Sequence, residues 1–156
     1  MTGFEKGALV LARTAEDNFS LANLMRSNLY SAMATLKIGL DLMLKEEGVK
    51  VDEMYGHGGY FKTKGVGTTI AAAAINAPVS VMETASEGGA WGIALLAAYL
   101  DKKAGMSLSE YLSDVIFKDA KCEKCEPKAE DVEGFDEYIE KYKKGLSIER
   151  AAVDAL

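Results

Sequence analysis

The stretch "MYGHGGYFKTKGVGTTIAAAAINAPVSVM", Met54–Met82, decides the fold of this chain. After a glycine-rich loop, an alanine-rich segment over Val66–Ile75 predicts a helix, and the apolar run Val79–Met82 behind a proline predicts a strand. Another strand is predicted before the loop, over Val49–Tyr55. This order predicts an α/β layer whose glycine loop follows the carboxyl end of a strand, where open sheets usually bind ligands.

Upstream of this stretch, the sequence predicts one more strand and a long helix. The short apolar run Gly7–Ala12 is typical of a strand. Between Ser20 and Glu47, apolar residues recur at three- and four-residue steps, and Gly48 provides a stop signal. We therefore expect an amphipathic helix whose apolar face packs in the core.

Downstream, the chain predicts mainly helices. We expect a helix over residues 90–105, a capping box that Ser107 and Glu110 form, and two further short helices over residues 131–145 and 147–156. Between these helices lies the charged segment "KDAKCEKCEPKAEDVEG", which we expect to be a solvated connection without regular structure.

Composition limits the classes of function. The 156 residues are 49% hydrophobic and 27% charged, which predicts one globular domain. A net charge of −6 argues against a nucleic-acid partner, because such binding relies on clustered Lys and Arg. No apolar run is long enough to cross a membrane, and the N-terminus has no secretory pattern, so we expect a cytoplasmic protein without a membrane partner.

Two cysteines, Cys122 and Cys125, stand at the spacing of a zinc or redox pair. A structural zinc site needs four ligands, and the one histidine of the chain, His57, lies in the distant glycine loop. We therefore expect two reduced thiols and no metal site. A metal or redox module that uses the two cysteines stays as an alternative hypothesis.

The glycine loop fits neither of two known phosphate-binding patterns. A P-loop requires Gly-Lys-Ser or Gly-Lys-Thr four residues after a glycine, whereas Gly59 is followed there by residues 64–66, Lys-Gly-Val. A dinucleotide fingerprint requires a third glycine after Gly56 and Gly58, where this chain has Phe61.

The glycines of the loop still permit an anion site. Gly58 and Gly59 let the backbone approach a ligand without a Cβ in the way, and the helix that follows turns its N–H groups toward an anion. This arrangement suits a nucleotide, but two glycines after a strand also make ordinary tight turns. Both interpretations stay open on spacing alone.

The segment "YGHGGYFKTKGVGTTIAAAAINAPVSVMETASEGGAWGIALLAAYL", Tyr55–Leu100, resembles the C-terminal lobe of the FGGY carbohydrate kinases, particularly pentulose kinases such as xylulokinase and ribulokinase. In that family a strand ends in a Gly-Gly turn with Lys-Ser after it, and a helix, a Pro-Val strand and a Glu-Gly-x-Ala-x-Gly helix start follow. The matching positions, in order, are Gly58, Gly59, Lys62, Thr63, Pro78, Val79, Glu87, Gly88, Ala90 and Gly92.

This resemblance implies an actin- and hexokinase-like (ribonuclease H-like) lobe with additional C-terminal helices. It implies ATP-dependent phosphorylation of a sugar, with Mg²⁺, and a ketopentose such as xylulose or ribulose as the substrate. Gly58 and Gly59 would border the ATP or ADP, and Lys62 and Thr63 would lie beside it. The resemblance assigns no catalytic residue and no metal ligand to this chain.

The sequence departs from the family pattern in the loop and in the helix after it. Tyr60 and Phe61 stand where the family usually has small residues, and Ala72 or Ala73 stands where many members carry an aspartate. The adenine pocket therefore differs from the usual one. Either aromatic ring could stack on the base or could pack within the protein.

The resemblance also implies a missing half. These kinases are much longer, and their N-terminal lobe supplies the first phosphate loop, most sugar contacts and the aspartate that activates the sugar hydroxyl. We therefore expect residues 1–156 to be the nucleotide-side domain of a longer protein, inactive by itself and prone to self-association. A non-catalytic binding or assembly domain that kept the fold is the alternative.

Overall fold

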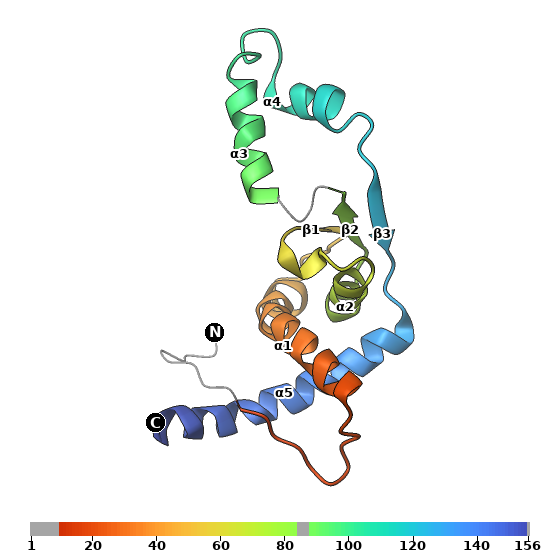
Figure 1. Cartoon of the computed structure of the whole chain (residues 1–156), viewed down its shortest axis with the longest axis vertical. Helices are drawn as coiled ribbons and strands as arrows, with labels where there is room; N and C mark the ends of the chain where they lie inside the picture. The colour runs from red at the N-terminus through yellow and green to blue at the C-terminus, as the bar shows by residue number, and fades with distance from the viewer. Residues whose placement is uncertain (1–9, 84–87, 156) are drawn as a thin grey trace. The chain divides into compact units, whose positions relative to one another are not determined.

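The computed structural model describes residues 10–83 and 88–155 (Figure 1). These residues fall into two compact units, which we describe separately. The first unit contains residues 10–52, 70–77 and 127–155, and the second contains residues 53–69, 78–83 and 88–126. Within the described ranges, no helix combines the length and apolar character needed to cross a membrane.

The first unit is helical. Helix α1 (Leu21–Asp41) begins at Ser20, whose side chain accepts a backbone hydrogen bond in the first turn, and it ends in a π-helical turn (Leu42–Glu46). Gly48 follows in the left-handed conformation, with φ +64°. The predicted long helix and its stop signal are therefore confirmed.

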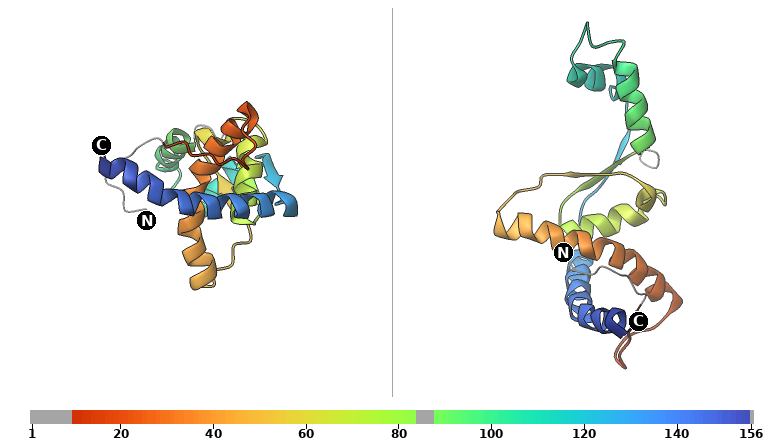
Figure 2. Two further views of the ribbon diagram at one scale, coloured as in Figure 1. Left: turned by 90° about the horizontal axis from the view of Figure 1, so that it is seen from below. Right: turned by 90° about the vertical axis from the view of Figure 1, so that its left-hand side faces the viewer.

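Helix α5 (Ala129–Ala155) crosses α1 in the views of Figures 1 and 2. The prediction of two short helices here is wrong, because the chain stays helical through Gly134 and Gly145. Each glycine costs roughly 1 kcal/mol relative to alanine in a helix interior. Packing of the apolar face of α5 offsets this cost.

The core of the first unit lies where α1, α2 (Val66–Ile75) and α5 meet. Tyr30 of α1 places its ring 5.0 Å from that of Phe135, and Tyr138 donates a hydrogen bond to the backbone oxygen of Ser27. Small side chains from α1 and α2 let the helices approach closely. The buried cluster comprises Ala34, Ala73, Ala74, Phe135 and Ile139.

The second unit carries a mixed three-stranded sheet in the order β1-β2-β3. Strand β1 (Met54–Gly56) pairs parallel with β2 (Val79–Met82), and β2 pairs antiparallel with β3 (Cys122–Cys125). The predicted helix over Val66–Ile75 and the predicted strand over Val79–Met82 are confirmed with their bounds. The predicted α/β class is confirmed at this level.

Three strand predictions need correction. The strand expected over Val49–Tyr55 is reduced to β1, because β1 pairs only along the few residues that β2 offers after its proline. The charged segment expected to lack structure contributes β3. Of the strand expected over Gly7–Ala12, residues 7–9 lie outside the described residues, and residues 10–12 are not a strand.

Helix α3 (Gly88–Tyr99) and the short helix α4 (Leu108–Glu110) complete the second unit. The expected helix over residues 90–105 is confirmed, but it begins two residues earlier and ends six residues earlier. The expected capping box is present, because Ser107 and Glu110 exchange hydrogen bonds between side chain and backbone. A π-helical turn extends α4 as far as Ile116.

Candidate functional site

The predicted loop joins the carboxyl end of β1 to the start of α2. It contains a 3-10 turn over Gly59–Phe61, closed by hydrogen bonds from Phe61 N to Gly58 O (3.1 Å) and from Lys62 N to Gly59 O (3.2 Å). Strand, turn and helix therefore follow in the order expected for a ligand loop at the end of a strand.

Gly58 and Gly59 have open backbones. Gly58 has φ +99°, a conformation that side-chain-bearing residues rarely adopt, so a glycine is required there. Gly59 is not among the residues with positive φ. A Cβ placed on either glycine would meet no atom within 4 Å. The two glycines thus expose main chain that a ligand can approach.

Other glycines around the loop pack against side chains of the protein. A Cβ at Gly56 would lie 2.6 Å from the ring of Phe61, and a Cβ at Gly67 would overlap the backbone oxygen of Tyr60. The rings of Tyr60 and Phe61 also contact each other edge to face, with 5.5 Å between centroids. The two aromatic residues that depart from the family pattern therefore fold the loop onto β1 and α2.

His57, the first residue of the loop, lies beside the start of α3. A Cβ at Gly88 would come within 2.9 Å of Nδ1 of His57, so the glycine leaves room for the imidazole ring. Glu87, which precedes this helix start, lies outside the described residues.

Lys62 and Thr63 follow the turn, and both are exposed. The backbone oxygen of Thr63 accepts a hydrogen bond from Val66 N (3.2 Å), which opens the first turn of α2. Lys64, which sequence reasoning did not select, is 85% exposed at its side chain and pairs with Glu123 of β3 at 3.3 Å. Its signal in the sequence was a second lysine two positions after Lys62.

The loop has three kinds of group that can contact a ligand: the exposed backbone of two glycines, two exposed lysines and the N-terminal end of α2. These groups attract an anion, because the helix end and the lysine side chains carry positive charge. A polyphosphate is an anion of suitable size. The loop itself contains no carboxylate to activate a hydroxyl group.

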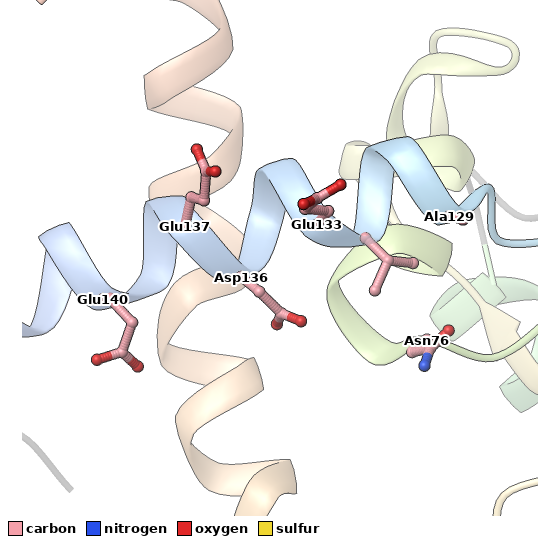
Figure 3. Close-up of a pocket in the computed structure, with 7 residues that line it drawn as sticks. Asn76, Ala129, Glu133, Asp136, Glu137 and Glu140 are labelled. Carbon is pink, nitrogen blue, oxygen red and sulfur yellow. The ribbon is translucent and has the colours of Figure 1, made fainter.

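A separate open groove lies on the first unit, along α5 (Figure 3). Its lining includes four carboxylates of α5 together with the residue that follows α2, namely Glu133, Asp136, Glu137, Glu140 and Asn76. Negative charge in this number repels phosphate groups. The groove therefore does not suit ATP, and it contains none of the predicted site residues.

The two cysteines lie on β3 and do not face each other. Cys122 pairs with Met82 and Cys125 with Val79, and side chains three residues apart on a strand point to opposite faces. Both thiols are free, and Cys125 instead contacts the hydroxyl of Thr69, at 3.7 Å. In the described part of the chain, no three His, Cys, Asp or Glu side chains gather as metal ligands. The metal or redox hypothesis therefore gains no support.

Comparison with known proteins identifies one family. Residues 3–100 match the C-terminal domain of the FGGY family of carbohydrate kinases. No curated protein and no solved structure matches the chain. The matched range includes β1, the glycine loop, α2 and β2, and it ends one residue after α3.

Proposed function

Because the chain belongs to the FGGY family of carbohydrate kinases, we propose that it supplies the nucleotide-binding wall of a kinase for a ketopentose such as xylulose or ribulose. Membership of this family implies the general activity, which is the phosphorylation of a sugar with ATP. The choice of a pentulose and the assignment of residues are our proposal, and the likeness of Tyr55–Leu100 to pentulose kinases supports the first of these.

One observation carries the assignment of the nucleotide site. Gly58 and Gly59 expose their backbones at the end of β1, whereas Gly56 is covered by the ring of Phe61 and Gly67 by the backbone and ring of Tyr60. A glycine that no protein atom covers has room for a ligand at the Cα position. We assign this open turn to the phosphates of ATP.

The neighbouring residues have supporting roles in this proposal. Lys62 and Thr63 lie beside the phosphates, where an ammonium group and a hydroxyl group both favour phosphate oxygens. Lys64 lies at the same end of α2, where Glu123 of β3 balances its charge. Mg²⁺ in such sites is usually held by substrate phosphates and one or two carboxylates, so we propose that it arrives with ATP.

We also propose that the chain works with a second, N-terminal lobe in an actin- and hexokinase-like arrangement. The match to a domain described as C-terminal supports this, as does the mixed sheet with helices. A phosphoryl transfer needs a group that orients the sugar hydroxyl, and the loop contains none. The base and most sugar contacts would come from the other lobe.

The sequence support for the alternative function, a non-catalytic binding or assembly domain, is the departure from the family pattern at Tyr60 and Phe61. Both rings pack within the protein, because Phe61 lies against Gly56 and Tyr60 lies against Gly67. Their presence therefore does not require that the nucleotide site was lost, and no observation in the described residues favours the alternative.

The test of the nucleotide site is the substitution Gly59→Val. Gly59 has no positive φ and an open Cβ position, so the protein should fold while the new side chain occupies the space that we assign to phosphate. We expect the affinity for ATP and ADP, measured by titration calorimetry with Mg²⁺ on the chain joined to an N-terminal FGGY lobe, to fall at least about tenfold.

The matched control is Gly39→Val on α1, where the Cβ position is equally open and the residue is exposed. It should leave the affinity for ATP unchanged. Unchanged affinity in a folded Gly59→Val protein would exclude the turn from the site.

The activity itself is tested with a coupled assay of ADP release. The chain joined to an N-terminal FGGY lobe should turn over xylulose or ribulose, whereas the chain alone should not, because it lacks the base and the closure that excludes water. Turnover with hexoses or glycerol but not with pentuloses would contradict the proposed substrate. Sugar-dependent turnover by the chain alone would contradict the two-lobe proposal.

A further inference from the structure

One face of the sheet carries polar groups from all three strands. Ser80 of β2 lies opposite Tyr55 of β1 and opposite Lys124 of β3 in the sheet register. Residues that pair across strands point to the same face. The residue just before β1, Glu53, lies two positions before Tyr55 and therefore shares this face.

A hydrogen bond joins two of these groups. Ser80 is only 2% exposed, and its hydroxyl donates to the carboxylate of Glu53, which is partly buried. Lys124 balances the negative charge nearby: its hydrogen bond to Glu126 raises its pKa, and the charge of Glu53 raises it further. The carboxylate of Glu53 therefore accepts a hydrogen bond from Ser80 and lies near the positive charge of Lys124. These interactions link the start of β1 to β2, the central strand of the sheet.

The register of β1 needs such a link. Among the described residues, β1 is an edge strand of three residues whose backbone pairs with β2 alone. A slip by one residue would move every side chain of a strand to the other face. In β1 the slip would turn Gly56 away from Phe61, and the 3-10 turn that begins at Gly59 would lose its support on the strand.

We propose that Glu53 and Ser80 are positioning residues, which fix the register of β1 and thereby hold the turn at Gly58 and Gly59 in the conformation that binds the nucleotide phosphates. The last step rests on the proposed function, whereas the link between Ser80, β1 and the loop stands on the contacts alone. In the observed register, the carboxylate of Glu53 accepts the hydrogen bond from Ser80.

The experiment compares Ser80→Ala with the unchanged chain by two readouts. Hydrogen exchange of the amides of residues 54–62 should become about fivefold faster or more, because the register is less firmly held, while exchange in α1 and α5 should not change. The affinity for ATP should fall about fivefold as well.

Three further variants make the result decisive. Glu53→Ala removes the same hydrogen bond at a partly exposed position, so it tests the link if Ser80→Ala does not fold. Glu53→Gln keeps an acceptor oxygen and should restore slow exchange. Ser113→Ala removes an exposed, hydrogen-bonded serine outside the sheet and should have neither effect.

The outcomes separate the two proposals. Slow loop exchange in both Ser80→Ala and Glu53→Ala would overturn the positioning role. Faster exchange together with no ATP binding by the unchanged chain joined to an N-terminal FGGY lobe would support the link and contradict the proposed nucleotide site. Faster exchange with unchanged ATP affinity would show that the turn binds ATP independently of the β1 register, which would overturn the final step.

Discussion

Helices α2 and α3 have nearly the same composition and opposite surroundings. Both are rich in alanine, and neither contains a charged residue. In α2, residues Ala71 through Ile75 are all buried. Among the described residues, none of α3 is buried, and Ile93 is 72% exposed. The amino-acid composition that makes a helix therefore does not decide whether the helix is covered.

The difference comes from what each helix packs against. The second half of α2 packs with Phe135 and Ile139 of α5. Helix α3 packs through two aromatic contacts, in which Trp91 lies 5.6 Å from Phe117 and Tyr99 lies 5.5 Å from Tyr111, between ring centroids.

Ile93 and Leu96 of α3, and Leu100 directly after it, are exposed apolar residues. A helix that is apolar on all sides is normally buried. The exposed side of α3 is therefore the kind of surface through which we expect the chain to self-associate or to meet a second lobe.

The largest effect is expected when the same negative charge is placed on each of the two helices. Ala73 of α2 is 2% exposed, and Ala73→Asp would bury an unpaired carboxylate in the core, so the free energy of unfolding should fall by about 3–5 kcal/mol or more. Ala94 of α3 is exposed, and Ala94→Asp should change it by no more than about 0.5 kcal/mol. Denaturant unfolding followed by far-UV circular dichroism measures both values.

Equal losses in the two variants would break the comparison, because they would mean that α3 is covered in solution. Matched sedimentation measurements on the unchanged chain and Ala94→Asp would then distinguish burial within one chain from burial between copies. A concentration-dependent mass that Ala94→Asp abolishes would indicate association through α3.

Local signals were sufficient for the segments that decide the fold. The helix over Val66–Ile75 and the strand over Val79–Met82 were predicted with their bounds, because Gly65 and Pro78 mark their starts. Strand β3 was missed, since Glu, Lys and Cys have little preference for strands and pairing with β2 supplies the stabilisation. Long-range pairing of this kind leaves no trace in a local pattern.

The candidate site was predicted in part. The sequence placed Gly58 and Gly59 after a strand, which the structure bears out, and their contact with a nucleotide stays a prediction. It did not indicate that Gly56 and Gly67 are needed for packing against Phe61 and Tyr60, because spacing alone does not distinguish a glycine that faces a ligand from one that faces a neighbouring side chain.

A smaller effect is expected from pH at Tyr138 of α5, which packs against the core that also buries α2. Burial raises the pKa of Tyr138 to about 12, and the charge of Tyr142 adds to the shift. Because the folded pKa is above the ordinary value, Tyr138 contributes its full stability below pH 10 and loses it as the pH rises toward 12. The side chain is partly exposed, so we expect a loss of roughly 1–2 kcal/mol across this range.

The measurement is the free energy of unfolding between pH 9 and about 11.5, together with the tyrosinate absorbance of the folded protein. The variant Tyr138→Phe keeps the ring and removes the ionising group, so it should flatten the pH dependence. A dependence of the same size in Tyr138→Phe would assign the loss to other groups.

The smallest effect is expected at the capping box of α4, in the same unit as the exposed helix α3. Ser107 Oγ accepts a hydrogen bond from Glu110 N (3.2 Å) and donates one to the carboxylate of Glu110 (2.7 Å). Ser107→Ala removes both, which should destabilise the first turn of α4 by about 0.5–1 kcal/mol.

The single tryptophan of the chain, Trp91, reports this change locally, because its ring contacts Phe117 just beyond the π-helical turn that extends α4. If α3 and α4 form a marginal, partly uncovered pair, Ser107→Ala should lower the denaturant midpoint seen by Trp91 emission. It should leave the midpoint seen by circular dichroism of α1 and α5 almost unchanged, since these long helices dominate that signal. Identical shifts of both midpoints would mean that α3 unfolds together with the covered core, and the contrast between the two helices would then hold for their exposure but not for their stability.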